Sequence, residues 1–316
     1  MSDKHQDESK VNEAGNTTTG HSWDGIEEWN NPLPRWWVWT FYVTIIWGIG
    51  YTIAYPAWPL VSSATAGVLG FSTRAQVAED IAAVDERNAE IIAELAAVDL
   101  RTLTENEELN SFAVNAGAAV FRASCSQCHG SGAAGSTGFP NLIDDDWLWG
   151  GRIDEIAWTV ANGIRNETSP DARWSQMPAF GADELLSDDE IDQVVNYVLS
   201  LSGQDHDADL ATDGAVVFAN NCAACHGEQG TGSLMQTREF QDPEDYFPDE
   251  ELNGAPNLAD AIWLYGGTEE AIHASVYGAR FGVMPAWSAE YRPAIGLTPA
   301  EINAVSAYVH QLGGGE

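Results

Sequence analysis

The sequence predicts an all-α chain in which one N-terminal transmembrane helix precedes two tandem helical domains. Three observations lead to this fold class. A long uncharged apolar run begins at Trp36, the later part of the chain repeats itself with a period of about 100 residues, and each repeat closes with an amphipathic helix. Each closing helix carries the Ser or Thr followed three residues later by Glu that caps a helix N-terminus.

The apolar run extends from Trp36 to Tyr55, and no charged residue follows until Arg74. At about 1.5 Å per residue the run spans roughly 30 Å, the thickness of the hydrocarbon core of a bilayer. Trp and Tyr at both ends suit the two membrane interfaces. A cleaved signal peptide is the alternative, but the run is too long and the residues before it are more acidic than basic. We expect a retained transmembrane helix over residues 35–58.

The segments on either side of this anchor have different compositions. Residues 1–34 form the expected cytoplasmic tail, and the first 22 of them are polar enough to predict a flexible segment. Residues 59–104 form a linker in which apolar side chains recur at helical spacing from Arg74 to Leu100. This spacing predicts a spacer helix.

The repeat divides the rest of the chain into predicted domains at residues 105–203 and 204–316. The matched segments are residues 117–121 with 214–218, 140–142 with 256–258, 147–151 with 263–267, 177–180 with 284–287, and 187–201 with 298–312. Two homologous helical domains follow from this. The second contains an acidic insertion, Leu234 to Leu252, that is expected to be a surface loop.

All four cysteines belong to two Cys-x-x-Cys-His motifs. They are Cys125, Cys128 and His129 in the first repeat, and Cys222, Cys225 and His226 in the second. This spacing is the attachment signature of haem c, in which two thioethers hold the macrocycle and the His binds iron. A redox dithiol or half of a zinc site is the alternative, and the second copy argues against it. We therefore predict two covalently bound haems c.

Covalent attachment of haem c takes place on the outer side of the bacterial inner membrane. The part of the chain after about residue 100 is therefore expected in the periplasm. Arg35 at the start of the anchor agrees with a cytoplasmic N-terminus. The chain is thus predicted to cross the inner membrane once.

Methionine is the candidate sixth ligand in both repeats. Met177 follows the first motif and Met284 the second, each within a Met-Pro-Ala-aromatic sequence. His/Met ligation fills both axial positions and favours electron transfer over substrate chemistry. Chain order predicts the pairs His129 with Met177 and His226 with Met284. The alternative is that these methionines only fill core space.

Arg165 and Arg280 occupy equivalent places in the repeats. A guanidinium group can bind a haem propionate with two parallel hydrogen bonds, so both are candidate cofactor-binding residues. An ordinary surface arginine is the alternative reading. His273 has no His counterpart in the first repeat, and its role is left open.

The formal net charge is −35, from 13 Lys and Arg against 48 Asp and Glu. Such a chain repels phosphate backbones, so nucleic acid is excluded as a partner. Lys4 and Lys10 are the only lysines. The acidic surface indicates either adaptation to high salt or a docking surface for a basic electron donor.

The segment Trp-Asp-Gly-Ile-Glu-Glu-Trp-Asn-Asn-Pro-Leu-Pro-Arg-Trp-Trp, residues 23–37, resembles the N-terminal signature of the dihaem subunit III of cbb(3)-type cytochrome c oxidase. The resemblance covers residue 23 to the end. It implies that the chain accepts electrons from a soluble cytochrome c or the bc(1) complex. It also implies transfer through a monohaem cytochrome c subunit to the haem-copper catalytic subunit, so that this chain itself does not reduce oxygen.

Two other functions share some of these sequence features. A free-standing, membrane-anchored dihaem carrier would share both haem motifs and the anchor, and copurification with a haem-copper subunit would separate the two. A dihaem peroxidase needs one iron with an open sixth position. The matched Met-Pro motifs argue against it.

Overall fold

The computed structural model describes residues 11–232 and 253–313. The acidic insertion predicted as a surface loop, residues 234–252, lies outside them. Contacts along the chain define two units, Met1–Arg87 and Asn88–Glu316, and each is described by itself.

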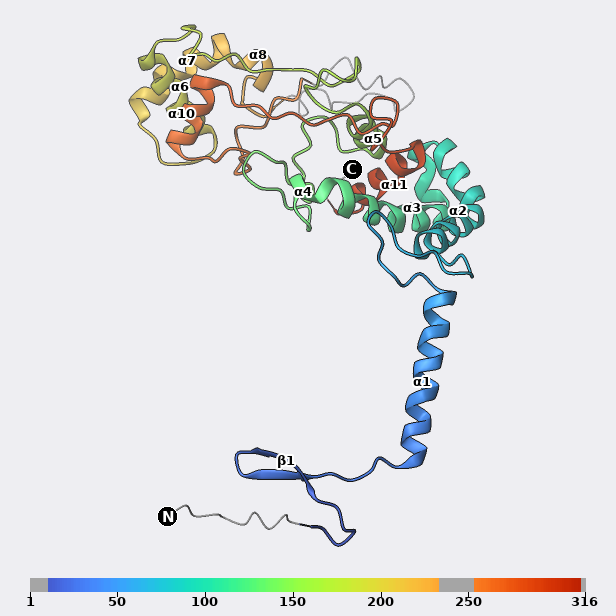
Figure 1. The fold of residues 1–316 in the computed structure, drawn as a ribbon. Helices are drawn as coiled ribbons and strands as arrows, with labels where there is room; N and C mark the ends of the chain where they lie inside the picture. The colour runs from blue at the N-terminus through green and yellow to red at the C-terminus, as the bar shows by residue number, and fades with distance from the viewer. Residues whose placement is uncertain (1–10, 233–252, 314–316) are drawn as a thin grey trace, which may run out of the picture. The chain divides into compact units, whose positions relative to one another are not determined.

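The first unit contains a β-hairpin that sequence reasoning missed (Figure 1). Strands β1, Thr18–Trp23, and β2, Ile26–Trp29, pair antiparallel, with Trp23 opposite Ile26. Asp24 and Gly25 both have positive φ, 50° and 82°. That geometry gives the two-residue turn whose twist matches a hairpin, and Asp-Gly is a preferred sequence for it. The predicted all-α class is therefore wrong for this segment, as is the flexible tail at residues 18–22.

Helix α1, Arg35–Ala54, is found where the anchor is predicted. It is long and apolar enough to cross a membrane, and none of its residues is buried inside the protein. Its Thr hydroxyls bond to carbonyls of the same helix, as Thr40 Oγ1 does to Trp36 O at 3.0 Å. These bonds satisfy polar groups that hydrocarbon would not solvate. The helix ends at Tyr55, which is extended because a proline follows it.

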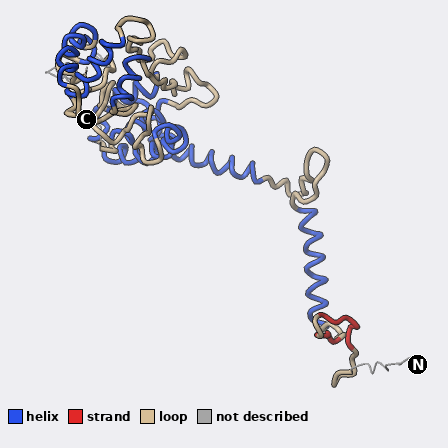
Figure 2. Tube along the Cα trace, turned by 90° about the vertical axis from the view of Figure 1, so that its left-hand side faces the viewer, coloured by secondary structure: helices blue, strands red, loops and turns tan. Residues whose placement is uncertain are grey.

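Helix α2, Thr73–Ala97, occupies the place of the predicted spacer helix. The second unit then consists of helices joined by long loops (Figure 2). Its elements are a 3₁₀ helix η1, Leu100–Glu105; α3, Glu107–Val120; a π-helical turn η2, Phe121–Cys125; α4, Ser126–His129; α5, Ile153–Asn162; α6, Asp188–Leu201; α7, Ala208–Asn221; α8, Ala223–His226; α10, Glu269–Gly278; and α11, Pro299–His310.

Two hydrophobic cores form within this unit, one at each haem motif. The first core gathers α3 and α5 of the first repeat with α11, the closing helix of the second repeat. The second core gathers α7 and α10 of the second repeat with α6, the closing helix of the first. In Figure 1, α6 accordingly lies with α7 and α10, while α11 lies by α3.

Packing in the second unit therefore crosses the boundary between the predicted domains, residues 105–203 and 204–316. Each core takes its haem motif from one repeat and its closing helix from the other. The two repeats have similar closing helices, and either one can present an apolar face to either core. Chain order alone does not decide between them.

Candidate haem sites

Each Cys-x-x-Cys-His motif ends in a single helical turn. The first motif begins at Cys125, the last residue of η2, and continues through α4. The second begins at Cys222, the residue before α8, and continues through α8. Positions three and four apart on a helix share a face, so both thiols and the imidazole of a motif lie on one side. Gly130 and Gly227 then turn the chain away with φ of 78° and 80°, which glycine adopts freely.

The two motif histidines make the same hydrogen bond. His129 Nδ1 lies 3.0 Å from Pro140 O, and His226 Nδ1 lies 3.0 Å from Pro256 O. A carbonyl oxygen only accepts, so Nδ1 must carry the proton and donate. Nε2 of the neutral ring is then left with a free lone pair, the form in which His binds a metal. The repeated Pro-Asn-Leu sequence thus has a function that the sequence alone did not reveal.

Burial also favours the neutral form of these rings. It lowers the pKa of both His129 and His226 below the ordinary value, while the hydrogen bonds to the proline carbonyls oppose the shift. Since the imidazole must be unprotonated to bind iron, the local environment suits an axial ligand.

The thiols do not behave as a redox pair would. Burial, with a smaller effect from the neighbouring Cys, raises the pKa of Cys125 and of Cys222 to about 11. Reactive Cys-x-x-Cys pairs instead have a lowered pKa. Among the described residues no group of three or more His, Cys, Asp or Glu side chains suits a metal ion. The residues present therefore fit covalent attachment of haem better than the dithiol or zinc readings.

The structure places the methionines differently from the pairs that chain order predicts. Met284 packs against the first core, as does Cys125 of the first motif. Met177 packs against the second core, with Cys222. The predicted pairs His129 with Met177 and His226 with Met284 are therefore not the ones that the structure brings together.

Backbone hydrogen bonds hold each methionine segment in place. Ile164 and Met284 exchange two bonds of 3.0 Å, and the buried Asn166 adds one from its side-chain amide to Met284 O at 3.2 Å. In the second core, Phe180 N donates to Val276 O at 3.1 Å. Both segments are thus tied to the end of the helix that follows the other repeat's haem motif.

Arg165 is engaged by the backbone rather than left free. Its Nε donates to Gly282 O at 2.8 Å and its Nη1 to Ser175 O at 3.1 Å. Burial lowers the pKa of this guanidinium, and Tyr265 opposes the shift. Both contacts lie on the segments that connect the two cores.

Arg280 is exposed, and its guanidinium lies 6.0 Å from the ring centroid of Tyr265. A buried cation that sequence reasoning missed is Arg173, which lies over the Trp149 ring at 5.6 Å and donates to Thr159 Oγ1 at 2.9 Å. Arg173 and Arg280 both lie four residues before the methionine of their repeat, a match that sequence reasoning missed because it paired Arg280 with Arg165.

His273 does not lie at a haem motif. Its Nε2 is 3.6 Å from Asp192 Oδ1, and its ring stacks on Tyr277. The side chain is partly exposed on α10 where that helix packs on α6. These contacts give it a surface role between two helices and not a role as an axial ligand.

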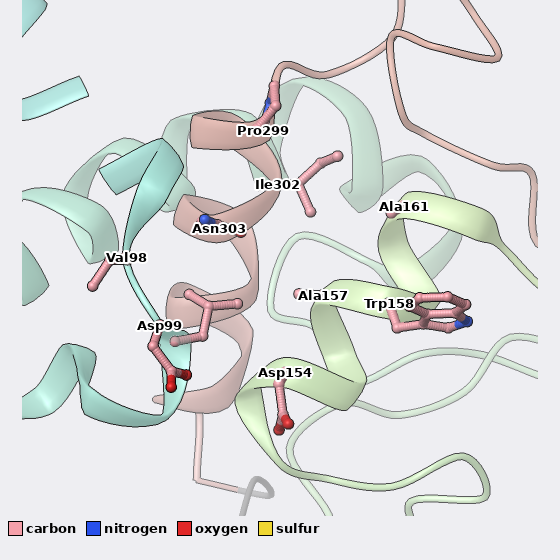
Figure 3. A pocket seen from close by; sticks show the side chains of 10 residues that line it. Val98, Asp99, Asp154, Ala157, Trp158, Ala161, Pro299, Ile302 and Asn303 are labelled. Carbon is pink, nitrogen blue, oxygen red and sulfur yellow. The ribbon is translucent and has the colours of Figure 1, made fainter. Parts of the chain in front are cut away.

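A shallow pocket lies away from the motifs, between α5, α11 and the start of η1 (Figure 3). Leu100, Ala157, Trp158 and Ile302 contribute to its wall. None of the cysteines, motif histidines or candidate methionines lines it. It is a packing gap between helices of the first core, separate from the haem sites.

Three family models match consecutive parts of the chain. Residues 15–62 match the N-terminal domain of cytochrome oxidase-cbb3, FixP. Residues 112–198 match cytochrome c oxidase, cbb3-type, subunit III, and residues 211–313 match cytochrome c. The first of these includes the β-hairpin and α1.

Curated relatives match along nearly the whole chain. The cbb3-type cytochrome c oxidase subunit CcoP of Cereibacter sphaeroides is 58% identical over 299 residues, covering 95% of each chain. The subunit FixP of Sinorhizobium medicae is 47% identical over 316 residues, covering both chains fully. The subunit CcoP of Rhodobacter capsulatus is 51% identical over 302 residues, covering 95% of this chain and 96% of the relative.

Proposed function

This chain belongs to the CcoP/FixP family, subunit III of the cbb3-type cytochrome c oxidases, and on that premise we propose how its residues carry electrons. It is an electron-transfer subunit of the oxidase complex with covalently bound haem c. We propose two haems, one at each Cys-x-x-Cys-His motif. The four thiols would form the thioethers, and Nε2 of His129 and of His226 would bind iron.

The single observation that carries this proposal is the pair of His–Pro hydrogen bonds, which are 3.0 Å in both motifs. They leave Nε2 of both imidazoles unprotonated and able to bind iron, on the side of the helical turn that carries the thiols. Met177 and Met284 would then supply the sixth ligands, because each packs against the core of a haem motif. When bound, the haem iron supplies a reversible one-electron centre.

If one of these histidines and one of these methionines held each haem iron, no position would remain for oxygen or peroxide. The chain would then act as a non-catalytic subunit that passes electrons by outer-sphere transfer. A dihaem peroxidase is not favoured, because both cores contain a candidate sixth ligand.

We further propose that the chain crosses the bacterial inner membrane once through α1, with its N-terminus in the cytoplasm and its haem sites in the periplasm. Arg35 at the start of α1, and the haem motifs beyond its other end, support this orientation. A soluble cytochrome c or the bc(1) complex would be the donor. A monohaem cytochrome c subunit would accept the electrons and pass them to the haem-copper catalytic subunit.

Of the two arginines considered for the haem propionates, Arg280 is the better candidate. Its side chain is exposed, whereas Arg165 already donates to two backbone carbonyls. A guanidinium with free donors can bind a carboxylate with two parallel bonds.

The test is purification of the detergent-solubilised complex through a tag on this chain. A haem-copper subunit and a monohaem cytochrome should copurify, and this chain should carry two haems c by peptide mass. A chain that purifies alone with both haems would contradict membership of the complex and leave the free-standing carrier.

A further inference from the structure

We propose that the loop after α1, residues 56–72, lies in the membrane interface, where it contacts lipid headgroups and the first part of the acyl chains. We term it the cap loop. It connects α1 to α2 and is drawn in tan between these two helices in Figure 2. This inference rests on the proposed membrane anchor and adds a second lipid-facing element to it.

The cap loop contains no charged residue. The uncharged stretch that begins at Trp36 continues beyond α1 through Thr73, although the whole chain contains 48 Asp and Glu. Charge returns with Arg74, and α2 then carries Glu79 and Asp80. Charged side chains are costly in hydrocarbon, so the boundary with water fits the start of α2 better than the end of α1.

Large apolar side chains of the cap loop are exposed. Five of them have 59% or more of their surface accessible, namely Trp58, Leu60, Val61, Val68 and Leu69. Covering apolar surface that water would otherwise contact is favourable by about 25 cal/mol per Å². Acyl chains provide such a cover, and Trp is a preferred residue at the level of the headgroups.

Polar groups of the cap loop bond within the loop instead. Thr65 is half-buried, and its Oγ1 accepts hydrogen bonds from Ala57 N at 3.3 Å and from Trp58 N at 3.1 Å. Thr65 N donates to Trp58 O at 2.9 Å, and Leu60 N donates to Ser63 O at 2.6 Å. The loop thus turns apolar side chains outward and keeps these backbone groups paired, as a lipid environment requires.

The cap loop also closes the end of α1. The last carbonyls of a helix have no partner within that helix. Val68 N donates to Ile53 O at 3.0 Å, and Leu69 N donates to Ala54 O at 3.1 Å. Water is scarce at the boundary of the acyl chains, so hydrogen-bond donors from the chain itself replace it there.

Gly67 allows the loop to return to the helix. It has a φ of 73°, and a methyl group added to it would meet Ala54 O. Gly70 has a similar φ of 62°, but no atom lies within 4 Å of its added methyl group. Both positions favour glycine by conformation, whereas only Gly67 also requires it by contact.

The length of α1 sets the depth of the cap loop. The helix has 20 residues, so at about 1.5 Å per residue it spans roughly the 30 Å of the hydrocarbon core. The loop folds back on the last turn, where Phe71 packs edge-on against Tyr55 with ring centroids 5.5 Å apart. It therefore lies at the edge of the core, where interfacial elements bury apolar side chains by about 5–10 Å.

A neighbouring subunit is the other surface that could cover the cap loop. A protein interface of ordinary size forms about ten hydrogen bonds and is rich in Arg. The loop has no charged side chain, and two of its four hydroxyls, those of Thr65 and Ser72, already accept bonds from nearby backbone N–H groups. The loop is continuous with α1, none of whose residues is buried, and this continuity favours the bilayer.

Single introduced cysteines can test this placement. All four native cysteines belong to the haem motifs, so in the haem-loaded chain of the proposed function they form thioethers and leave no other free thiol. Val61→Cys and Val68→Cys place a bimane fluorophore in the cap loop. Ile46→Cys places it in α1, and Glu86→Cys places it on an exposed position of α2.

The full-length, haem-loaded chain is placed in vesicles of phosphatidylcholine and phosphatidylglycerol. The quenchers are iodide in the water and lipids that carry a nitroxide either near the headgroup or near the end of the acyl chain. We expect the nitroxide near the headgroup to quench the labels at Val61 and Val68 most strongly. The nitroxide near the acyl end should quench the label at Ile46, and iodide should quench the label at Glu86.

The two possible failures differ in this experiment. Iodide quenching at Val61 and Val68 as strong as at Glu86, with Ile46 still quenched by lipid, would overturn the placement of the cap loop and leave the anchor intact. Loss of lipid quenching at Ile46 would instead overturn the anchor in the proposed function, and the placement of the loop with it.

The same labels in the purified oxidase complex distinguish lipid from a partner subunit. We expect the nitroxide near the headgroup to quench the labels at Val61 and Val68 there as it does in the isolated chain. Labels that are protected from both iodide and nitroxide would show that a neighbouring subunit covers the cap loop, and would overturn the proposal.

Gly67→Ala tests whether contact with α1 holds the loop in place, and Gly70→Ala is the matched control for a positive φ. In Gly67→Ala, we expect the label at Val61 to be quenched less by the nitroxide near the headgroup and more by iodide. In Gly70→Ala the quenching should stay at the parent level. Equal quenching in the two variants would overturn the seating of the cap loop on the end of α1.

Discussion

Ile164 and Met284 exchange two backbone hydrogen bonds of 3.0 Å, although they belong to different repeats of the sequence. Ile164 lies just after the end of α5, the helix that follows the first haem motif in the sequence. The pair fixes the second methionine segment in the first haem site. The packing of each core therefore depends on both repeats.

The helix crossing at Gly214 should be sensitive to one added methyl group. We expect Gly214→Ala to lower the free energy of unfolding by about 1–3 kcal/mol, because the methyl group would meet Gln193 O. Gly278→Ala is the matched control, since no atom lies within 4 Å of its added methyl group. Denaturant unfolding followed by circular dichroism compares them. Equal effects of the two substitutions would contradict a close crossing at Gly214.

Asp146 should make stability depend on pH. Burial, with the nearby charge of Asp260, raises the pKa of Asp146 to about 6. Between about pH 4 and 6 the folded chain therefore keeps a proton that the unfolded chain has lost, and stability falls as pH rises through this window. Asp146→Asn should remove that fall.

The measurement is the melting temperature of the variant and the parent from pH 4 to pH 8. The melting temperature of Asp146→Asn should rise above that of the parent as pH increases to about 6, and the difference should then stay constant. It corresponds to a gain of about 1–3 kcal/mol in the free energy of unfolding. Asp145→Asn changes an exposed neighbour and is the matched control. A constant difference between Asp146→Asn and the parent at every pH would show that Asp146 titrates normally.

The acidic surface should act through hydration more than through steering of a basic donor. Lysine is absent after Lys10, and acids are spread through both repeats. We expect the rate of electron uptake from a reduced donor cytochrome to fall by much less than a hundredfold between about 0.05 and 1 M salt, where the Debye length shrinks from over 10 Å to about 3 Å. A fall of about a hundredfold or more, with the haem sites still folded at low salt, would favour donor steering.

The membrane helix should stay on the mature protein. Its Thr side chains bond to its own carbonyls, and its surface carries no charge after Arg35. Mass spectrometry of the mature chain should therefore find residues before Trp36 still attached. A mature N-terminus at Gly67 would show instead that the segment is a signal peptide.

The haem motifs, the anchor and the candidate methionines could be predicted because each depends on a short local pattern. Cys125, Cys128 and His129 are neighbours in sequence, and the apolar run of α1 needs no partner to be recognised. The hairpin was also predictable, since Asp24-Gly25 is a strong turn signal, but the polar composition around it pointed to a flexible tail.

The packing of each closing helix on the core of the other repeat could not be predicted in the same way. Met177 and Met284 lie in nearly identical motifs, and the helices that follow them carry the same type of cap. By local pattern, each methionine segment and the closing helix after it are therefore compatible with either core. The choice depends on long-range contacts, such as Arg165 with Gly282 and Gly214 with Gln193, that have no signature in the repeat.

The central claim is that both irons carry His and Met and so transfer electrons without binding substrate. The most direct test is the weak methionine-to-iron charge-transfer band of the oxidised full-length protein in the near infrared. We expect an intensity for two haems, with Met177→Leu and Met284→Leu each removing about half of the band and lowering the potential of one haem. Val283→Leu should change neither quantity. If the band stays intact in both methionine variants, the account of ligation is wrong.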